Sequence, residues 1–265
     1  IIKVFFLYSF LTVAIFILFN LSGIRLFNSL NLSMTVSSAG GFLPTNSLSD
    51  IIKHTSQEII LSVGLIFATL NIYFFYSLSS DFKNIKKHYE DIVILGGVFL
   101  FSLIIFFSIG NIQFINIFLN VISSVSNSGI SSYEPPKNLY LFFVFLTIIG
   151  GSLISNSNGI KFIRIYILFK STIFELFKLV TPNIIIDQKI FNTQHKINNE
   201  NLNSSFLIFI CFFISIFILS SILAAGGLNF ENSFKLSILT ITNTVNSTLY
   251  GLDEINFVNL LTSSK

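Results

Sequence analysis

The stretch GGSLISNSNGIK, residues 150–161, interrupts a long apolar run from 138 to 169. Its Ser, Asn and Gly residues lie where a regular helix in lipid would be expected, and irregular backbone at that depth must be surrounded by protein or water. We therefore predict a broken helix at this point. Lys161, at the end of the break, either extends its stem toward the aqueous phase or lines an internal pathway.

The composition places the whole chain in a membrane. Of 265 residues, 52% are hydrophobic and 10% are charged, and the mean hydropathy is +0.81. A soluble domain carries about 25% charged residues, so a soluble enzyme, a nucleic-acid-binding protein and a disordered chain are excluded. The net charge of +3 is too small to indicate an anionic partner. With a single cysteine and three scattered histidines, we expect no transition-metal site and no bound cofactor.

Apolar segments long enough to cross a bilayer alternate with shorter, more polar ones. A spanning helix needs about 20 apolar residues, and the stretches that approach this length are 4–20, 58–79, 92–109, 138–169 and 205–225. The shorter segments are 24–42, 111–130 and 229–248, and each ends in Ser, Thr, Asn or Gly. We predict that these three are re-entrant hairpins, because they are too short and too polar to span.

The basic residues predict the orientation of the chain. Loops 80–91 and 161–200 together carry nine of the 15 Lys and Arg residues, and basic loops remain on the cytoplasmic side. The three hairpins then enter from the outer face. The connection 170–204, which overlaps the second loop, is either a docking site for a regulatory partner or a solvated basic linker.

The order of span, hairpin, span and basic loop recurs along the chain. The hairpins read FNSLNLSMTVSSAGGF (27–42), INIFLNVISSVSNSGI (115–130) and NSFKLSILTITNTVNS (232–247). Placing Gly41, Gly129 and Asn246 in register also aligns Thr35, Ser123 and Thr240, and likewise Ser38, Ser126 and Asn243. Two alternatives remain open: a chance match in low-complexity sequence, and polar residues that simply join helices by hydrogen bonds.

The polar ends of the hairpins are the candidate ion-binding residues. A short helix directs its partially negative C-terminal end toward the cavity beyond it, and rings of carbonyl and hydroxyl oxygens select alkali cations. The three runs contain no Asp or Glu, which favours monovalent over divalent cations. The candidate filter residues are Ser37, Ser38, Ala39, Gly40, Gly41, Ser126, Asn127, Ser128, Gly129, Asn243, Thr244, Val245 and Asn246.

These segments resemble the Trk/Ktr/HKT superfamily of cation transporters, and most closely the bacterial TrkH-type potassium-uptake subunits. The resemblance is carried by GGSLISNSNGIKFIRIYILFK (150–170), ELFKLVTPN (175–183), and the runs at 36–42, 123–130 and 243–251. It implies that the interrupted helix is a gate below a filter, with gate residues Ser155, Asn156, Ser157, Asn158, Gly159 and Lys161. The family favours Thr, Gly and Gly at 156–158, and glycine in place of Asn246, where Asn would have to adopt a positive φ.

The resemblance also implies an all-α polytopic membrane protein of tandem helix–hairpin–helix repeats around a pseudo-fourfold ion pathway. The expected organisation is 1–80, second repeat; 81–91, cytoplasmic basic loop; 92–169, third repeat, broken at 150–161; 170–204, cytoplasmic connection; and 205–265, fourth repeat without its last helix. The first repeat would be absent. Further implications are the bacterial cytoplasmic (inner) membrane as location, a homodimer, and a cytosolic nucleotide-binding (RCK-type) regulatory subunit.

The function predicted from the sequence is potassium uptake through a gated, filter-lined pore, with K⁺ as the transported ion. Two alternatives remain: a sodium-permeable relative, and a non-conducting homologue that keeps the scaffold for regulation or assembly. We expect no enzymatic activity, because the chain shows no nucleophile–base pair and no paired carboxylates within its apolar spans.

Overall fold

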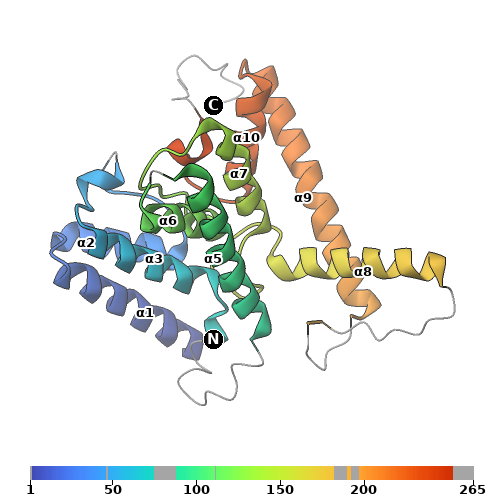
Figure 1. Cartoon of the computed structure of the whole chain (residues 1–265), viewed down its shortest axis with the longest axis horizontal. Coiled ribbons are helices and arrows are strands. Elements are labelled where there is room, and N and C mark those ends of the chain that lie inside the picture. The colour runs from blue at the N-terminus through green and yellow to red at the C-terminus, as the bar shows by residue number, and fades with distance from the viewer. Residues whose placement is uncertain are drawn as a thin grey trace.

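A computed structural model describes residues 2–45, 47–74, 88–110, 112–181, 190–191 and 197–252, and the regular structure of these residues is entirely helical (Figure 1). The basic residues Lys83, Lys86 and Lys87 of the first predicted cytoplasmic loop lie outside the described residues. The main helices are α1 (Ile2–Leu21), α2 (Leu26–Ser38), α3 (Thr55–Thr69), α5 (Tyr89–Ile109), α6 (Phe114–Val125), α7 (Tyr140–Ile149), α8 (Phe162–Val180), α9 (Asn199–Ala225) and α10 (Phe230–Ile241).

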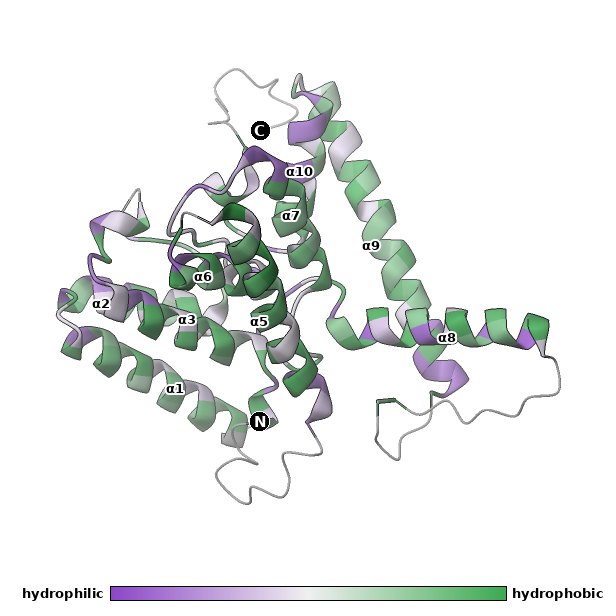
Figure 2. Cartoon of the chain, in the orientation of Figure 1, coloured by the Kyte–Doolittle hydropathy of each residue, from purple (hydrophilic) through white to green (hydrophobic). Residues whose placement is uncertain are grey.

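Three of the described helices are long and apolar enough to cross a membrane. They are residues Val4–Leu21 of α1, α5 and α9, and Figure 2 shows them as mostly hydrophobic along their length. Large apolar side chains on their outer surfaces, such as Phe107 and Phe217, are more than 70% exposed. In water such a surface would be unstable, whereas a lipid bilayer accommodates it.

The short helix α6 lies at the centre of the body, packed against α3, α5 and α7 (Figure 1). Its side chains Ile117, Leu119 and Ile122 are fully buried. The neighbouring pair α2 and α3 also approach closely, because Gly64 of α3 leaves room for the side chain of Val36. The short helices are therefore held inside the body by apolar packing, and their polar ends are positioned by that packing.

The expected break in the run 138–169 is present, since α7 ends at Ile149 and α8 begins at Phe162. One other expectation was wrong. The run 58–79 does not form one helix, because α3 ends at Thr69 and Leu70 is extended. Helix α8 runs through residue 170, where we expected the cytoplasmic connection to begin, and it projects away from the body in contact with α9 (Figure 1).

Candidate functional site

The three short helices α2, α6 and α10 end in the same backbone geometry. In each, one residue adopts a left-handed conformation directly after the last turn: Ala39 (φ 53°), Asn127 (φ 63°) and Asn243 (φ 51°). The amide that follows donates to a carbonyl five residues earlier: Gly40 to Thr35 (3.0 Å), Ser128 to Ser123 (3.1 Å) and Thr244 to Leu239 (2.8 Å). This pattern is a Schellman C-cap, which ends a helix and satisfies its last carbonyls.

The shared cap corrects the register predicted from the sequence. We call the segments that follow the caps of α2, α6 and α10 the first, second and third turns. When residues are counted from the left-handed one in each, the third turn has Val245, not Asn246, at the position of Gly41 and Gly129. The left-handed asparagine is Asn243, and Asn246 does not have a positive φ. The prediction of a positive φ at Asn246 was therefore wrong, and Leu239 and Thr242 take the places assigned to Thr240 and Asn243.

The turns after these caps converge on one another. Gly41 lies against the backbone carbonyl of Ser128, and Gly129 lies against the backbone of Val245. A Cβ atom on Gly41 would also be 3.0 Å from Cγ2 of Val245. Both glycines have a positive φ, of 72° and 73°, so a side chain at either position would be strained as well as obstructed. Segments from three distant parts of the sequence thus meet at close range.

Hydrogen bonds between hydroxyl groups stabilise the second turn, which follows α6. The Oγ atom of Ser128 lies 3.0 Å from Oγ of both Ser123 and Ser126, and all three residues are fully buried. Asn127 is equally buried, and its side-chain amide donates to the carbonyl of Thr147 at 2.7 Å. The three hydroxyls and the amide nitrogen of Asn127 are engaged in holding the turn, whereas Oδ1 of Asn127 is buried and has no hydrogen-bond partner among the described residues. The backbone carbonyls and this oxygen are therefore the candidates for ion ligands.

The loop 150–161 docks against the end of α3. The amides of Ser152 and Asn156 donate to the carbonyls of Thr69 (2.9 Å) and Ala68 (3.1 Å). These carbonyls belong to the last turn of α3, where a continuing helix would have used them itself. The docked loop therefore takes the place of the helical turn that the sequence predicted after Thr69.

Within this loop, the ammonium group of Lys161 is surrounded by oxygen atoms of the loop itself. It donates to the carbonyl and Oγ of Ser155, both at 3.1 Å, and to the carbonyl of Ser157. Lys161 therefore closes the loop on itself, which neither interpretation of the sequence anticipated. Gly159 (φ 82°) lies against the carbonyls of Thr147 and Ile148, and the carbonyl of Asn158 lies against Gly150, so the far end of the loop returns to α7.

Asn156 joins the loop to the first turn. Its side-chain amide donates to the carbonyl of Ser37, in the last turn of α2, and its Oδ1 accepts from the hydroxyl of Tyr8 on α1. Of the six predicted gate residues, Asn156 is the one whose side chain contacts a predicted filter residue. The loop and the first turn are therefore in direct contact through this side chain.

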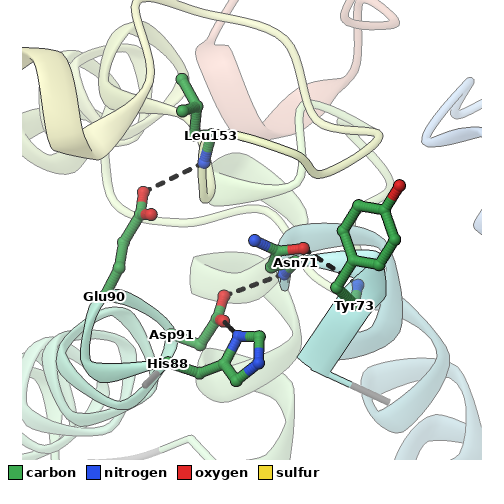
Figure 3. A network of polar contacts seen from close by, with 6 residues as sticks. All are labelled: Asn71, Tyr73, His88, Glu90, Asp91 and Leu153. Carbon is green, nitrogen blue, oxygen red and sulfur yellow. Dashed lines mark hydrogen bonds and ion pairs between the residues drawn. The ribbon is translucent and has the colours of Figure 1, made fainter. Parts of the chain in front are cut away.

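Two acidic residues at the start of α5 hold neighbouring segments, Glu90 the loop and Asp91 the residues that follow α3 (Figure 3). The Glu90 carboxylate accepts from the amide of Leu153 at 3.0 Å, and Asp91 accepts from the amide of Asn71 at 2.8 Å. Asp91, 1% exposed, also lies 3.4 Å from Nδ1 of His88. The sequence analysis missed this pair. A usable signal was the placement of two carboxylates at the N-terminus of an apolar helix, where the helix dipole stabilises negative charge.

Among the residues that the structure describes, no cluster of three or more His, Cys, Asp or Glu side chains could hold a metal ion. At the turns themselves, the polar groups described above are hydroxyls, an amide and backbone atoms. The predicted filter residues Gly41, Ser128, Gly129, Thr244 and Val245 are brought together, and the predicted gate residues form one docked loop beside them.

No model of a known protein family matches the chain. It is 26% identical over 235 residues to an uncharacterized cation transporter, MJ1485, of Methanocaldococcus jannaschii, which covers 86% of this chain and 47% of that protein. It is 24% identical over 253 residues to the Trk system potassium uptake protein TrkG of Escherichia coli, covering 91% of this chain and 51% of TrkG. The chain thus spans about half the length of these relatives.

The fold matches the crystal structure of the potassium transporter TrkH from Vibrio parahaemolyticus. The TM-score is 0.84 at 20% sequence identity, and the match covers 99% of this chain and 57% of TrkH. The distant sequence similarity and the shared fold thus agree with each other and with the apolar helices. The chain is therefore similar in sequence to these two transporters and in fold to TrkH, and three of its described helices are long and apolar enough to cross a membrane.

Proposed function

We propose that this chain forms part of a gated pore through which potassium ions enter the cell. The observation that carries the proposal is the meeting of three polar turns, in which Gly41 lies against Ser128 and Gly129 against Val245. Carbonyl oxygens at such a meeting point can replace the hydration shell of K⁺. The absence of carboxylates from the three runs supports a monovalent ion.

The driving force in this proposal is the membrane potential. Moving one elementary charge across 100 mV is worth about 2.3 kcal/mol, and a potential that is negative inside favours entry of a cation. The protein then needs to supply a pathway and a means of closing it. We assign the closing role to the loop 150–161, because Asn156 ties it to Ser37 and because Lys161 holds the loop together through Ser155 and Ser157.

The proposed organisation follows the repeats expected from the sequence. Residues 1–80 and 92–169 would each contribute one helix–hairpin–helix unit to the pathway, and residues 205–265 would contribute a helix and a hairpin. Loops 80–91 and 161–200 would face the cytoplasm. The location is the inner membrane of a bacterial cell. A homodimer and a cytosolic nucleotide-binding regulatory subunit complete the proposal, and both rest on the resemblance to Trk systems.

Two alternatives have specific support. A sodium-permeable pore is favoured by the departures from the family pattern at the third turn. A non-conducting homologue is favoured by the glycines that this chain lacks relative to the family pattern, at Asn246 and, in the loop, at Ser157 and Asn158. Flux measurements with both ions separate these alternatives from potassium uptake.

The test is rubidium uptake by the protein with its natural flanking sequence, expressed in cells that lack their own potassium uptake systems. Wild type should restore uptake, and Gly129→Arg should abolish it while the amount of protein in the membrane is preserved. Gly129→Arg should also lose some stability, because Gly129 has a left-handed φ. Ser128→Ala is therefore a milder second variant. It keeps the backbone of the turn and should alter the preference for rubidium over sodium. Undiminished rubidium uptake by Gly129→Arg would exclude the filter assignment.

A further inference from the structure

The point where the three turns meet is occupied by a side chain. The first and second turns present glycine there, at Gly41 and Gly129, whereas the third presents Val245. The Val245 backbone lies against Gly129, with its amide nitrogen 3.2 Å from the place a Cβ would take on that glycine. On its other side, Cγ2 of Val245 is 3.0 Å from the equivalent place on Gly41. Val245 therefore contacts both of the other turns.

Val245 places an apolar side chain at a point where the other two turns have none. Gly41 and Gly129 place no side chain beside the backbone carbonyls, which can offer oxygen atoms to an ion, whereas the isopropyl group of Val245 offers none. A cation that loses its water must gain oxygen ligands in return, and an apolar constriction resists both ions and water by dewetting. A methyl group of Thr244 lies 2.9 Å from the Cβ place of Gly129 and adds to the apolar character of the same side.

We propose that the side chain of Val245 narrows the ion pathway where the three turns meet and thereby limits the rate of cation passage through this protein. This inference rests on the proposed function, and it adds a residue that sets the rate. At the equivalent position the first and second turns have glycine. The register predicted from the sequence had placed Asn246 there.

The experiment is a size series at position 245 in the protein with its natural flanking sequence, assayed by initial rates of rubidium and sodium uptake. Val245→Ala and Val245→Gly should raise the rubidium rate in that order, by about tenfold for glycine, as expected for a lowered barrier. Val63→Ala is the matched control, since it removes the same methyl groups from an outward position on α3 that is 40% exposed. Its rate should equal that of wild type.

Asn246→Gly is compared with Val245→Gly. The register predicted from the sequence places residue 246 at the constriction, so Asn246→Gly would open it. The register seen in the structure places residue 245 there, so Val245→Gly would open it. A larger increase in Asn246→Gly than in Val245→Gly would overturn the proposal. A role of Val245 in packing alone would instead lower uptake together with the thermal stability of the purified protein, and that result would also overturn it.

The failure of this inference can be distinguished from failure of the proposed function. If wild type conducts and the series at Val245 shows no increase, the role of Val245 is excluded and the pore remains. If wild type is silent and Val245→Gly conducts, both proposals are supported, and the side chain is a block. If all variants are silent although correctly inserted, both proposals fall.

Discussion

Removing the side chain of Asn156 should release the loop 150–161 from the first turn. Asn156 makes two side-chain hydrogen bonds that cross from the loop to other elements, one to the carbonyl of Ser37 and one from the hydroxyl of Tyr8. Each such bond contributes about 1 kcal/mol net. Asn156→Ala should therefore weaken the docked position of the loop by about 2 kcal/mol, which changes the ratio of released to docked loop by about 30-fold.

The variant Tyr8→Phe provides an internal scale, because it removes one of the two bonds and keeps the ring. About 1 kcal/mol corresponds to about a fivefold change in the same ratio. If the docked loop closes the pathway, rubidium uptake should rise in the order wild type, Tyr8→Phe, Asn156→Ala. The double variant should add little to Asn156→Ala, because both substitutions remove the same bond between Tyr8 and Asn156.

The assay is the initial rate of rubidium uptake, normalised to the amount of protein in the membrane and accompanied by thermal unfolding of the purified protein. The reasoning is refuted if Asn156→Ala lowers the unfolding temperature and leaves the uptake rate unchanged. In that case the contact with Ser37 would hold the fold together without controlling the pathway. Additive effects of the two substitutions would refute the geometry of the bond between them.

Three further outcomes follow from other contacts. Lys161→Met removes the ammonium group that donates to oxygens of Ser155 and Ser157 and closes the loop on itself. The loosened loop should raise rubidium uptake, and an unchanged rate would argue against the closing role of the loop. Asp91→Ala leaves the amide of Asn71 without its acceptor and should lower stability by about 2 kcal/mol, measured by thermal unfolding. Lys235 is buried, and its Nζ atom lies 2.6 Å from Oε1 of the exposed Glu231. Glu231→Ala should lower the unfolding temperature more than Lys235→Met, because only Glu231→Ala leaves a buried charge without its ion-pair partner. The reverse order of unfolding temperatures would contradict this.

The ends of the short helices could be located from the sequence, but their register could not. Runs of Ser, Asn and Gly marked the C-termini of α2 and α6 correctly, because these residues favour left-handed caps over continued helix. At α10 the run contains two asparagines, Asn243 and Asn246, and residue type alone does not choose between them. The choice depends on which amide reaches the carbonyl of Leu239, and Thr244 does so. A shift of one residue moved the filter position from Val245 to Asn246.

The broken helix could be predicted because its cause is local, whereas its docking could not be. Polar residues at 155–158 are enough to predict irregular backbone. The end of α3 at Thr69, by contrast, depends on amides of Ser152 and Asn156, which approach from a distant part of the chain. Similarly, Glu90 becomes a partner of the loop only because the fold brings the amide of Leu153 to its carboxylate.

The contact between Asn156 and Ser37 implies that the loop and the first turn do not move independently. Ser37 belongs to the last turn of α2, two residues before the left-handed Ala39 that begins the turn. Its carbonyl is one of the last of the helix, where no further helical amide is available to satisfy it, and the Asn156 amide supplies the donor instead. Release of the loop therefore leaves a carbonyl at the C-terminal end of α2 unpaired. If the turns bind the ion as proposed, conditions that open the loop should change the ion preference of the first turn as well as the rate of passage, and a gate confined to the loop would change the rate alone.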